Sequence, residues 1–216
     1  MSETKTGRGA AIAGILGILG NVGAIWFLWP AAHSWKPGRL DLWYAEYAAR
    51  PLDAALSGWS FTVGLAALAV FFAMLSEATR AERPGLLRLG TLLAAAGALL
   101  DAAGTQAPTV AVSLIGREGE ATRALLGMAL ALDASFNFLL GTGLVLANVA
   151  LGGASGWPRW LRGLGLVAGL ASLLVAGQLH SDRFADLLAI AGPLWLLWIG
   201  AVAFRLLRSP SSQPEG

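Results

Sequence analysis

The chain contains no cysteine, so it has no disulfide, no thiolate nucleophile and no cysteine-based metal site. Charged residues are also scarce, at 13% of the 216 positions, which is about half their share in an ordinary soluble domain. The HExxH, GxSxG, Walker and Rossmann patterns are all missing, and the sequence therefore indicates no particular reaction. A formal net charge of only +2 argues against nucleic acid as a partner.

Long apolar segments are what the sequence has in abundance, since hydrophobic residues make up 56% of it. A helix needs about 20 such residues to cross a bilayer. Backbone groups in lipid must be satisfied within the segment, so runs of this length predict helices. The six predicted spans are Ala10–Trp29, Ala54–Ser76, Pro84–Gly104, Ala124–Val149, Pro158–His180 and Phe184–Phe204. The predicted fold class is an all-α, polytopic membrane protein.

The distribution of Lys and Arg between the spans predicts the orientation. Nine of these residues fall on the side that carries both ends of the chain, and six fall on the other side. By the positive-inside rule, both termini are cytoplasmic. Residues 1–208 are predicted to form one transmembrane domain, and residues 209–216 a disordered cytoplasmic tail that is rich in Ser and Pro.

Two of the predicted outer connections have apolar character of their own. The segment Leu40–Arg50 places Leu40, Trp43, Tyr44 and Tyr47 on one helical face, which predicts a short amphipathic helix in the first outer loop, lying along the interface. The segment Pro108–Gly116 is apolar but too short to span. We expect it to be re-entrant or packed against the bundle.

Asp133 is the strongest candidate for a functional residue because it lies inside a predicted span. A carboxylate in the hydrocarbon region is costly unless it is paired or hydrated, and such residues usually mark functional sites. At about 100° per residue, Asn137, Gly141 and Asn148 share its face of the helix. We expect this polar stripe to point into the bundle and Asp133 to line a cavity that opens outward. The alternative is that these groups only hydrogen-bond other helices.

Asn21 provides a candidate partner from the first span. It follows a ridge of small residues that includes Gly14 and Gly17, and such a ridge lets another helix approach closely. Asn21 and Asn137 fall at about the same depth by residue count. We therefore predict that the first and fourth spans touch through these two amides.

The remaining candidates lie toward the predicted outer ends of their spans. Asp101 and His180 join the polar group, and Asp101 makes a carboxylate pair with Asp133 conceivable. The groups available to balance the charge of Asp133 on this side are Arg50, His180 and Arg183. Nothing in the spacing requires the two histidines of the chain to be neighbours, so neither a metal site nor a cofactor is predicted.

Three segments carry a resemblance to a known family. They are AAIAGILGILGNVGAIW near the start, GWPRWLRGLGLVAGLASLL in the middle, and GPLWLLWIGAVAFRLLR near the end. With these, the chain resembles a family of uncharacterised bacterial multi-pass proteins, of the domain of unknown function 4386 type. The resemblance implies a six-helix bundle in a bacterial inner membrane. It implies no activity, no cofactor and no catalytic residue.

The favoured interpretation is a non-enzymatic membrane protein that binds or passes a small molecule, lipid or ion through an outward-facing polar pocket. Asp133, Asn137 and Asn21 would form its core. A second interpretation is a structural or accessory subunit of a larger membrane complex, in which polar residues lock helices together. A membrane-embedded enzyme ranks third. The candidate partners are thus the lipid bilayer, a small-molecule or lipid ligand, and another membrane protein or a second copy of this chain.

Overall fold

The computed structural model describes residues 3–28, 36–115, 119–152 and 156–208, and these residues form helices and no strand. Six helices are long and apolar enough to cross a membrane. They are centred on α1 (Glu3–Leu28), α3 (Pro51–Ala78), α4 (Pro84–Gly104), α6 (Glu120–Ala150), α7 (Arg159–Val175) and α9 (Leu188–Arg208). Three of the spans include a short neighbouring element and run over Pro84–Ser113, Arg159–Leu179 and Asp182–Arg208. The prediction of an all-α protein with six membrane-length helices is confirmed.

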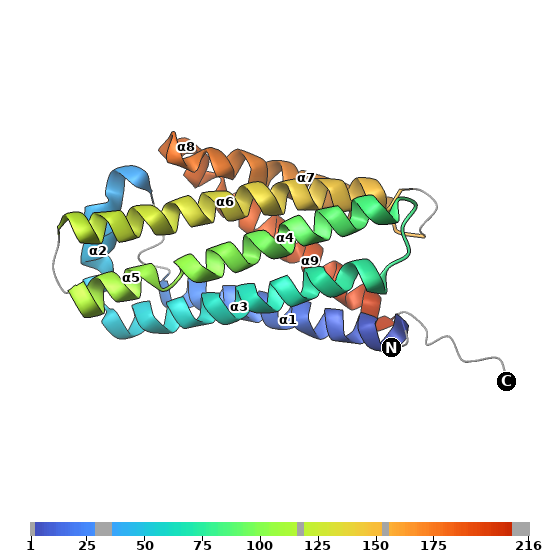
Figure 1. The fold of residues 1–216 in the computed structure, drawn as a ribbon, viewed down its shortest axis with the longest axis horizontal. Helices are drawn as coiled ribbons and strands as arrows, with labels where there is room; N and C mark the ends of the chain where they lie inside the picture. Colours follow the sequence, from blue (N-terminus) through green and yellow to red (C-terminus); the bar gives the residue numbers. More distant parts are fainter. Residues whose placement is uncertain (1–2, 29–35, 116–118, 153–155, 209–216) are drawn as a thin grey trace.

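The six long helices form a closed ring in chain order (Figure 1). Each helix packs against the next one along the chain, and α9 returns to pack against α1. Two indoles of α9 extend this packing across the ring. Trp198 stacks on Phe72, with ring centroids 6.5 Å apart, and Trp195 meets Phe136 of α6 edge-on at 6.2 Å. Both Trp side chains are buried, so α9 supplies much of the central core.

Short helical elements gather at one end of the bundle, which we call the α2 end (Figure 1). They are η2 (Pro37–Arg39), α2 (Leu40–Ala49), α5 (Ala107–Val110), the π-helical turn η3 (Ala111–Ile115), the 3-10 turn η4 (Ala176–Leu179) and α8 (Asp182–Asp186). The start of α1 and the α3–α4 and α6–α7 connections lie at the opposite end. Of the two alternatives for residues 108–116, packing against the bundle is confirmed for the described part, since α5 and η3 contact α6.

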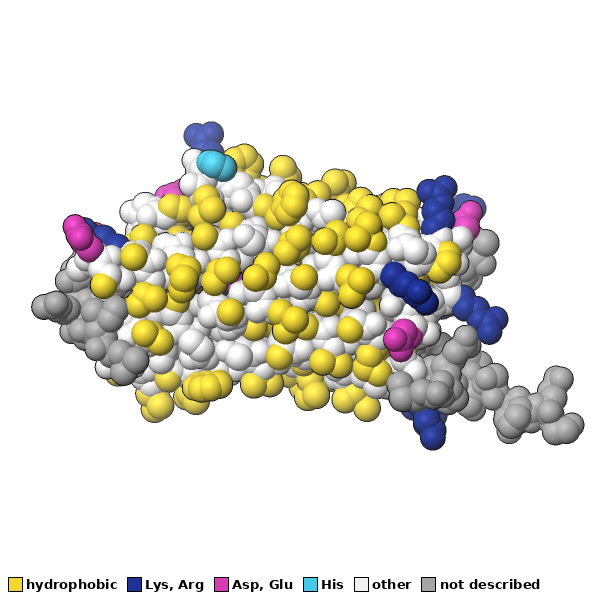
Figure 2. All heavy atoms as spheres, in the orientation of Figure 1, with side chains coloured by type: hydrophobic (Ala, Val, Ile, Leu, Met, Phe, Trp, Pro, Cys, Tyr) yellow, Lys and Arg dark blue, Asp and Glu magenta, His cyan; other side chains and the backbone are white. Residues whose placement is uncertain are grey.

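The surface has the pattern expected of a chain that sits in lipid. Apolar side chains cover the middle of the face seen in Figure 2, and Lys, Arg, Asp and Glu gather toward its two ends. Large apolar residues such as Leu19, Val63 and Leu92 are about 60% exposed. Exposed apolar area on this scale is unfavourable in water and favourable against acyl chains, which supports membrane insertion.

Glycines set the distance between α4 and α6. Gly90, Gly97 and Gly104 recur every seven residues along α4, and all three face α6. A Cβ atom on Gly143 of α6 would lie only 2.5 Å from the carbonyl oxygen of Gly90. Small residues at a helix crossing let backbones approach this closely. The same crossing brings Asp101 of α4 and Asp133 of α6 into one region.

Two predicted spans differ from the helices near the α2 end. The predicted span Pro158–His180 is helical as α7 only to Val175, where η4 tightens the chain into a 3-10 turn. The predicted span Phe184–Phe204 begins in α8, and α9 starts only at Leu188. The Ser181 hydroxyl caps the start of α8 by accepting the Arg183 N–H, and the single residue Leu187 separates α8 from α9. The predicted tail, residues 209–216, lies outside the described residues.

Candidate functional site

The polar stripe of α6 points into the bundle, as the sequence predicts. Asp133, Asn137 and Asn148 are at most 4% exposed. The Asp133 carboxylate accepts a hydrogen bond of 2.5 Å from Gln178 Nε2 and one of 3.3 Å from Asn137 Nδ2. An amide from a second element thus holds the carboxylate in place without a charge of opposite sign.

Gln178 is a residue that the sequence prediction missed. It lies in η4 and is only 1% exposed. The predicted counter-charges for Asp133 are wrong, because Arg50, His180 and Arg183 are all exposed. His180 also does not join the buried polar group. The sequence did contain a feature that could have identified Gln178, because it is the sole amide side chain in the apolar segment 158–180. An amide in such a segment needs a hydrogen-bond partner in the protein interior.

Asp101 is the second buried carboxylate, at 6% exposed, in the last turn of α4. It lies close enough to Asp133 for the second carboxyl to affect its ionisation. Within the described residues no hydrogen bond reaches the Asp101 carboxylate, and neither carboxylate has a Lys, Arg or His partner. The site therefore holds two carboxyl groups inside the bundle with no protein cation beside either of them among the described residues.

A small cavity lies beside Asp101 at the α2 end. It measures about 10 Å³ as the space open to the centre of a water molecule, which is room for about one water. Its lining comes from α2, α3, α4, α5, the connection between α4 and α5, and α6. The prediction that Asp133 lines the cavity is wrong, because Asp101 lines it and Asp133 lies behind, held by Gln178. Trp43 and Tyr47 of α2 form part of the lining.

Polar side chains from α3 and the α4–α5 connection form a network next to the cavity. The hydroxyls of Thr62 and Thr105 lie 2.8 Å apart, and Gln106 Nε2 donates to Thr62 Oγ1 at 2.9 Å. The α4–α5 connection is a break in the helix, because Pro108 has no N–H to give to the carbonyl of Gly104. Irregular backbone at membrane depth is tolerated where it is buried in protein or lines a cavity, and Thr105 of this connection lines the cavity.

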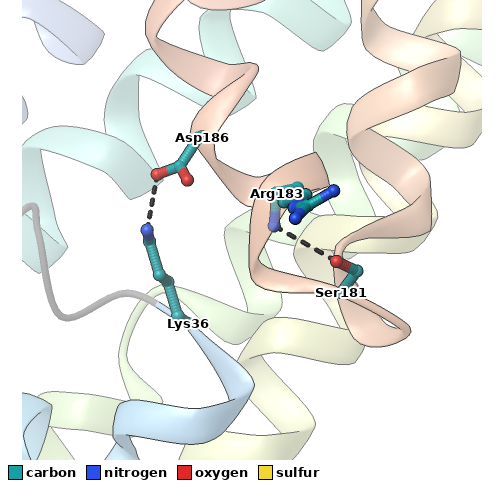
Figure 3. Close-up of polar contacts among 4 residues, drawn as sticks. All are labelled: Lys36, Ser181, Arg183 and Asp186. Carbon is teal, nitrogen blue, oxygen red and sulfur yellow. Dashed lines mark hydrogen bonds and ion pairs between the residues drawn. The ribbon is translucent and has the colours of Figure 1, made fainter.

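Two ion pairs fix α2 and the segment before it to the rest of the α2 end. Lys36 contacts Asp186 of α8 at 2.5 Å (Figure 3), and the Arg123 guanidinium makes two hydrogen bonds of 2.8 and 3.0 Å to Asp41. Both pairs are at least partly exposed, and each adds little stability alone.

Burial of Tyr47 raises the pKa of its phenol. The buried face of α2, formed by Trp43 and Tyr47, thus covers the cavity.

The predicted contact between Asn21 and Asn137 is wrong. Asn21 Nδ2 donates to the Gly17 carbonyl of its own helix at 2.8 Å and faces Gly64 of α3. Asn137 Nδ2 donates to Asp133, and the Asn137 Oδ1 atom has no hydrogen-bond partner among the described residues. Residue counting places the two amides at a similar depth, but α1 packs between α3 and α9 in the ring.

Asn148 belongs to a different contact, far along α6 from Asp133. Its Oδ1 atom accepts from the Trp198 indole of α9 at 3.2 Å. The backbone of Gly165 leaves the space that these two side chains occupy. This bond joins two helices across the core, and the geometry assigns Asn148 to packing.

The donor set of the site is made of oxygen and amide groups. In the part of the chain that the structure describes, no three His, Cys, Asp or Glu side chains cluster as a transition-metal site would require. Two carboxylates, hydroxyls and backbone carbonyls are suited to protons and hard cations.

Comparisons with protein-family models, with curated proteins and with solved structures found no match to this chain.

Proposed function

We propose that this chain is a six-pass protein of a bacterial inner membrane that binds or passes a small polar solute or ion through a pocket at its outer end, without catalysing a reaction. Both termini would be cytoplasmic, so the α2 end would face outward, with α2 as a short helix of the first outer loop. The excess of Lys and Arg at the opposite end supports this orientation. The resemblance to bacterial multi-pass proteins supports the location.

The observation that carries the proposal is the unbalanced carboxylate of Asp101 beside a cavity. Carboxylates within membrane spans are costly and are retained where they serve ion or substrate pathways. Asp133 can be explained by helix packing, because Gln178 and Asn137 satisfy it. Asp101 has no such explanation among the described residues, and it lines the cavity. A solute that carries positive charge or hydrogen-bond donors would supply what Asp101 lacks.

A second candidate function is that of a structural subunit in a membrane complex. The hydrogen bond between Trp198 and Asn148 favours it, because this buried polar contact joins two helices and does not line the cavity beside Asp101. A cavity with room for about one water also limits the size of any solute in this conformation. In the structural alternative, Asp101 would be an interior polar group with no ligand.

Native mass spectrometry of the gently solubilised protein separates the two candidates. We expect the wild type to retain a bound solute that the Asp101→Asn variant loses. Asp53→Asn is the matched control, because Leu52-Asp53-Ala54 repeats the tripeptide around Asp101 on another helix. Partner subunits in the spectrum, with no solute whose retention depends on Asp101, would contradict the proposal and favour the structural role.

A further inference from the structure

We propose that the cavity beside Asp101 is a binding site for one small monovalent cation, with sodium as the expected ion. The inference rests on the proposed function and specifies its solute. The site consists of the Asp101 carboxylate together with neutral oxygen atoms that converge on Gly58 of α3.

Oxygen atoms from the short segment 105–109 meet at Gly58. A Cβ atom there would lie 3.1 Å from the Thr105 carbonyl oxygen, 3.2 Å from Thr109 Oγ1 and 3.3 Å from Gln106 Oε1. Glycine is the residue that leaves this space open. Gly58 and Thr105 also line the cavity that Asp101 lines, so this group of oxygens borders the cavity of the carboxyl group.

Two of these oxygens are free to bind a ligand. The Thr109 hydroxyl oxygen is buried and has no hydrogen-bond partner among the described residues, and buried polar atoms of this kind call for a bound water or ion. Gln106 donates through Nε2 to Thr62 at 2.9 Å. That bond orients the amide so that its Oε1 atom is directed to the Gly58 side.

The electrostatics of the site favour a cation. Asp101 sits in the last turn of α4, where the helix dipole is negative and the last turn contains no basic residue. Asp133 adds a second carboxyl group nearby. The break between α4 and α5 follows directly, and carbonyls at the ends of broken membrane helices are recurrent ligands for sodium ions and protons.

Size and charge define the kind of cation. The cavity has room for about one water, so an ion must enter without its hydration shell and take its ligands from the protein. Carboxylate, carbonyl, amide and hydroxyl oxygens suit a hard ion. One carboxylate lines the cavity, and the Asp133 carboxylate is held by Gln178. A single positive charge therefore matches the single free carboxylate, whereas calcium would require six to eight oxygen ligands.

Binding of radioactive sodium to the purified protein in detergent tests the proposal. We expect saturable binding of one ion per chain, displaced by excess unlabelled sodium and more weakly by potassium. Asp101→Asn should weaken binding at least about tenfold, and Asp53→Asn should leave it unchanged. No saturable sodium binding by the wild type, equal binding by Asp101→Asn, or displacement of sodium by equimolar calcium would each overturn the assignment.

Two variants keep the test decisive if Asp101→Asn fails to fold. Gly58→Ala would place a methyl group among the three oxygens, and Thr109→Val would remove one oxygen at nearly constant volume. Both should lose sodium binding and the rise in unfolding temperature that sodium gives the wild type. Gly127→Ala is the control, because nothing lies within 4 Å of the added carbon. If sodium does not bind but native mass spectrometry shows a solute that depends on Asp101, the cation assignment fails and the proposed function stands.

Discussion

Replacement of Gly143 by alanine tests the crossing that brings the two carboxylates together. The added carbon would lie 2.5 Å from the Gly90 carbonyl oxygen and 2.9 Å from the Ala94 backbone nitrogen. Both neighbours are backbone atoms, so a side-chain rotation cannot relieve the clash and the helices must separate. Overpacking of this kind costs about 1–3 kcal/mol. The better helix propensity of alanine offsets up to about 1 kcal/mol of that cost.

Gly127→Ala on the same helix removes the propensity effect from the comparison, because nothing lies within 4 Å of its added carbon. The difference between the two variants then reports overpacking alone, and we expect Gly143→Ala to be less stable by about 1–3 kcal/mol. Reversible unfolding in mixed detergent micelles measures this difference. Equal stability of the two variants would refute the close approach of α4 and α6.

Two further predictions concern aromatic side chains. Burial raises the pKa of Tyr47 above its ordinary value of 10.0, so the free energy of unfolding falls as the pH rises through about 10. In a Tyr44→Phe variant Tyr47 is the one remaining tyrosine, and its tyrosinate absorbance should appear only above that pH. Half-titration of this tyrosine at pH 10 would contradict the burial of Tyr47. Trp198→Phe removes the 3.2 Å hydrogen bond to Asn148 and should lower the free energy of unfolding by at least about 0.6 kcal/mol. Trp160→Phe is the control, because the Trp160 side chain is exposed. Equal unfolding temperatures for the two variants would count against the hydrogen bond.

The spans could be predicted from the sequence because the bilayer imposes a length and a polarity on each helix. The predicted range Pro84–Gly104 agrees with α4 at both ends, since Pro84 suits the first turn and the helix breaks ahead of Pro108. The inward direction of Asp133 could also be predicted, because a carboxylate that faces lipid is too costly. These arguments use only one helix at a time.

Contacts between helices could not be predicted in the same way. Residue counting gives the depth of Asn21 and Asn137, but it does not say which helices are neighbours in the ring. His180 and Gln178 are two residues apart at nearly one depth, yet the 3-10 turn of η4 exposes the first and buries the second. The oxygens around Gly58 come from a helix break whose geometry depends on α3 and α6.

Sided labelling of single cysteines tests most directly the claim that the carboxylate site opens to the outside. Because the chain has no cysteine, each variant carries one thiol, and Ag⁺ is a small cation that reacts with it. In right-side-out vesicles, Ag⁺ added outside should modify Gly119→Cys, beyond the α2 end, and spare Glu82→Cys at the other end.

The decisive pair is Ala129→Cys, which lines the cavity, and Ala98→Cys, which is fully buried and does not line it. The account predicts that external Ag⁺ modifies Ala129→Cys and leaves Ala98→Cys intact. Modification of Ala129→Cys only from the cytoplasmic side, or from neither side, would contradict it.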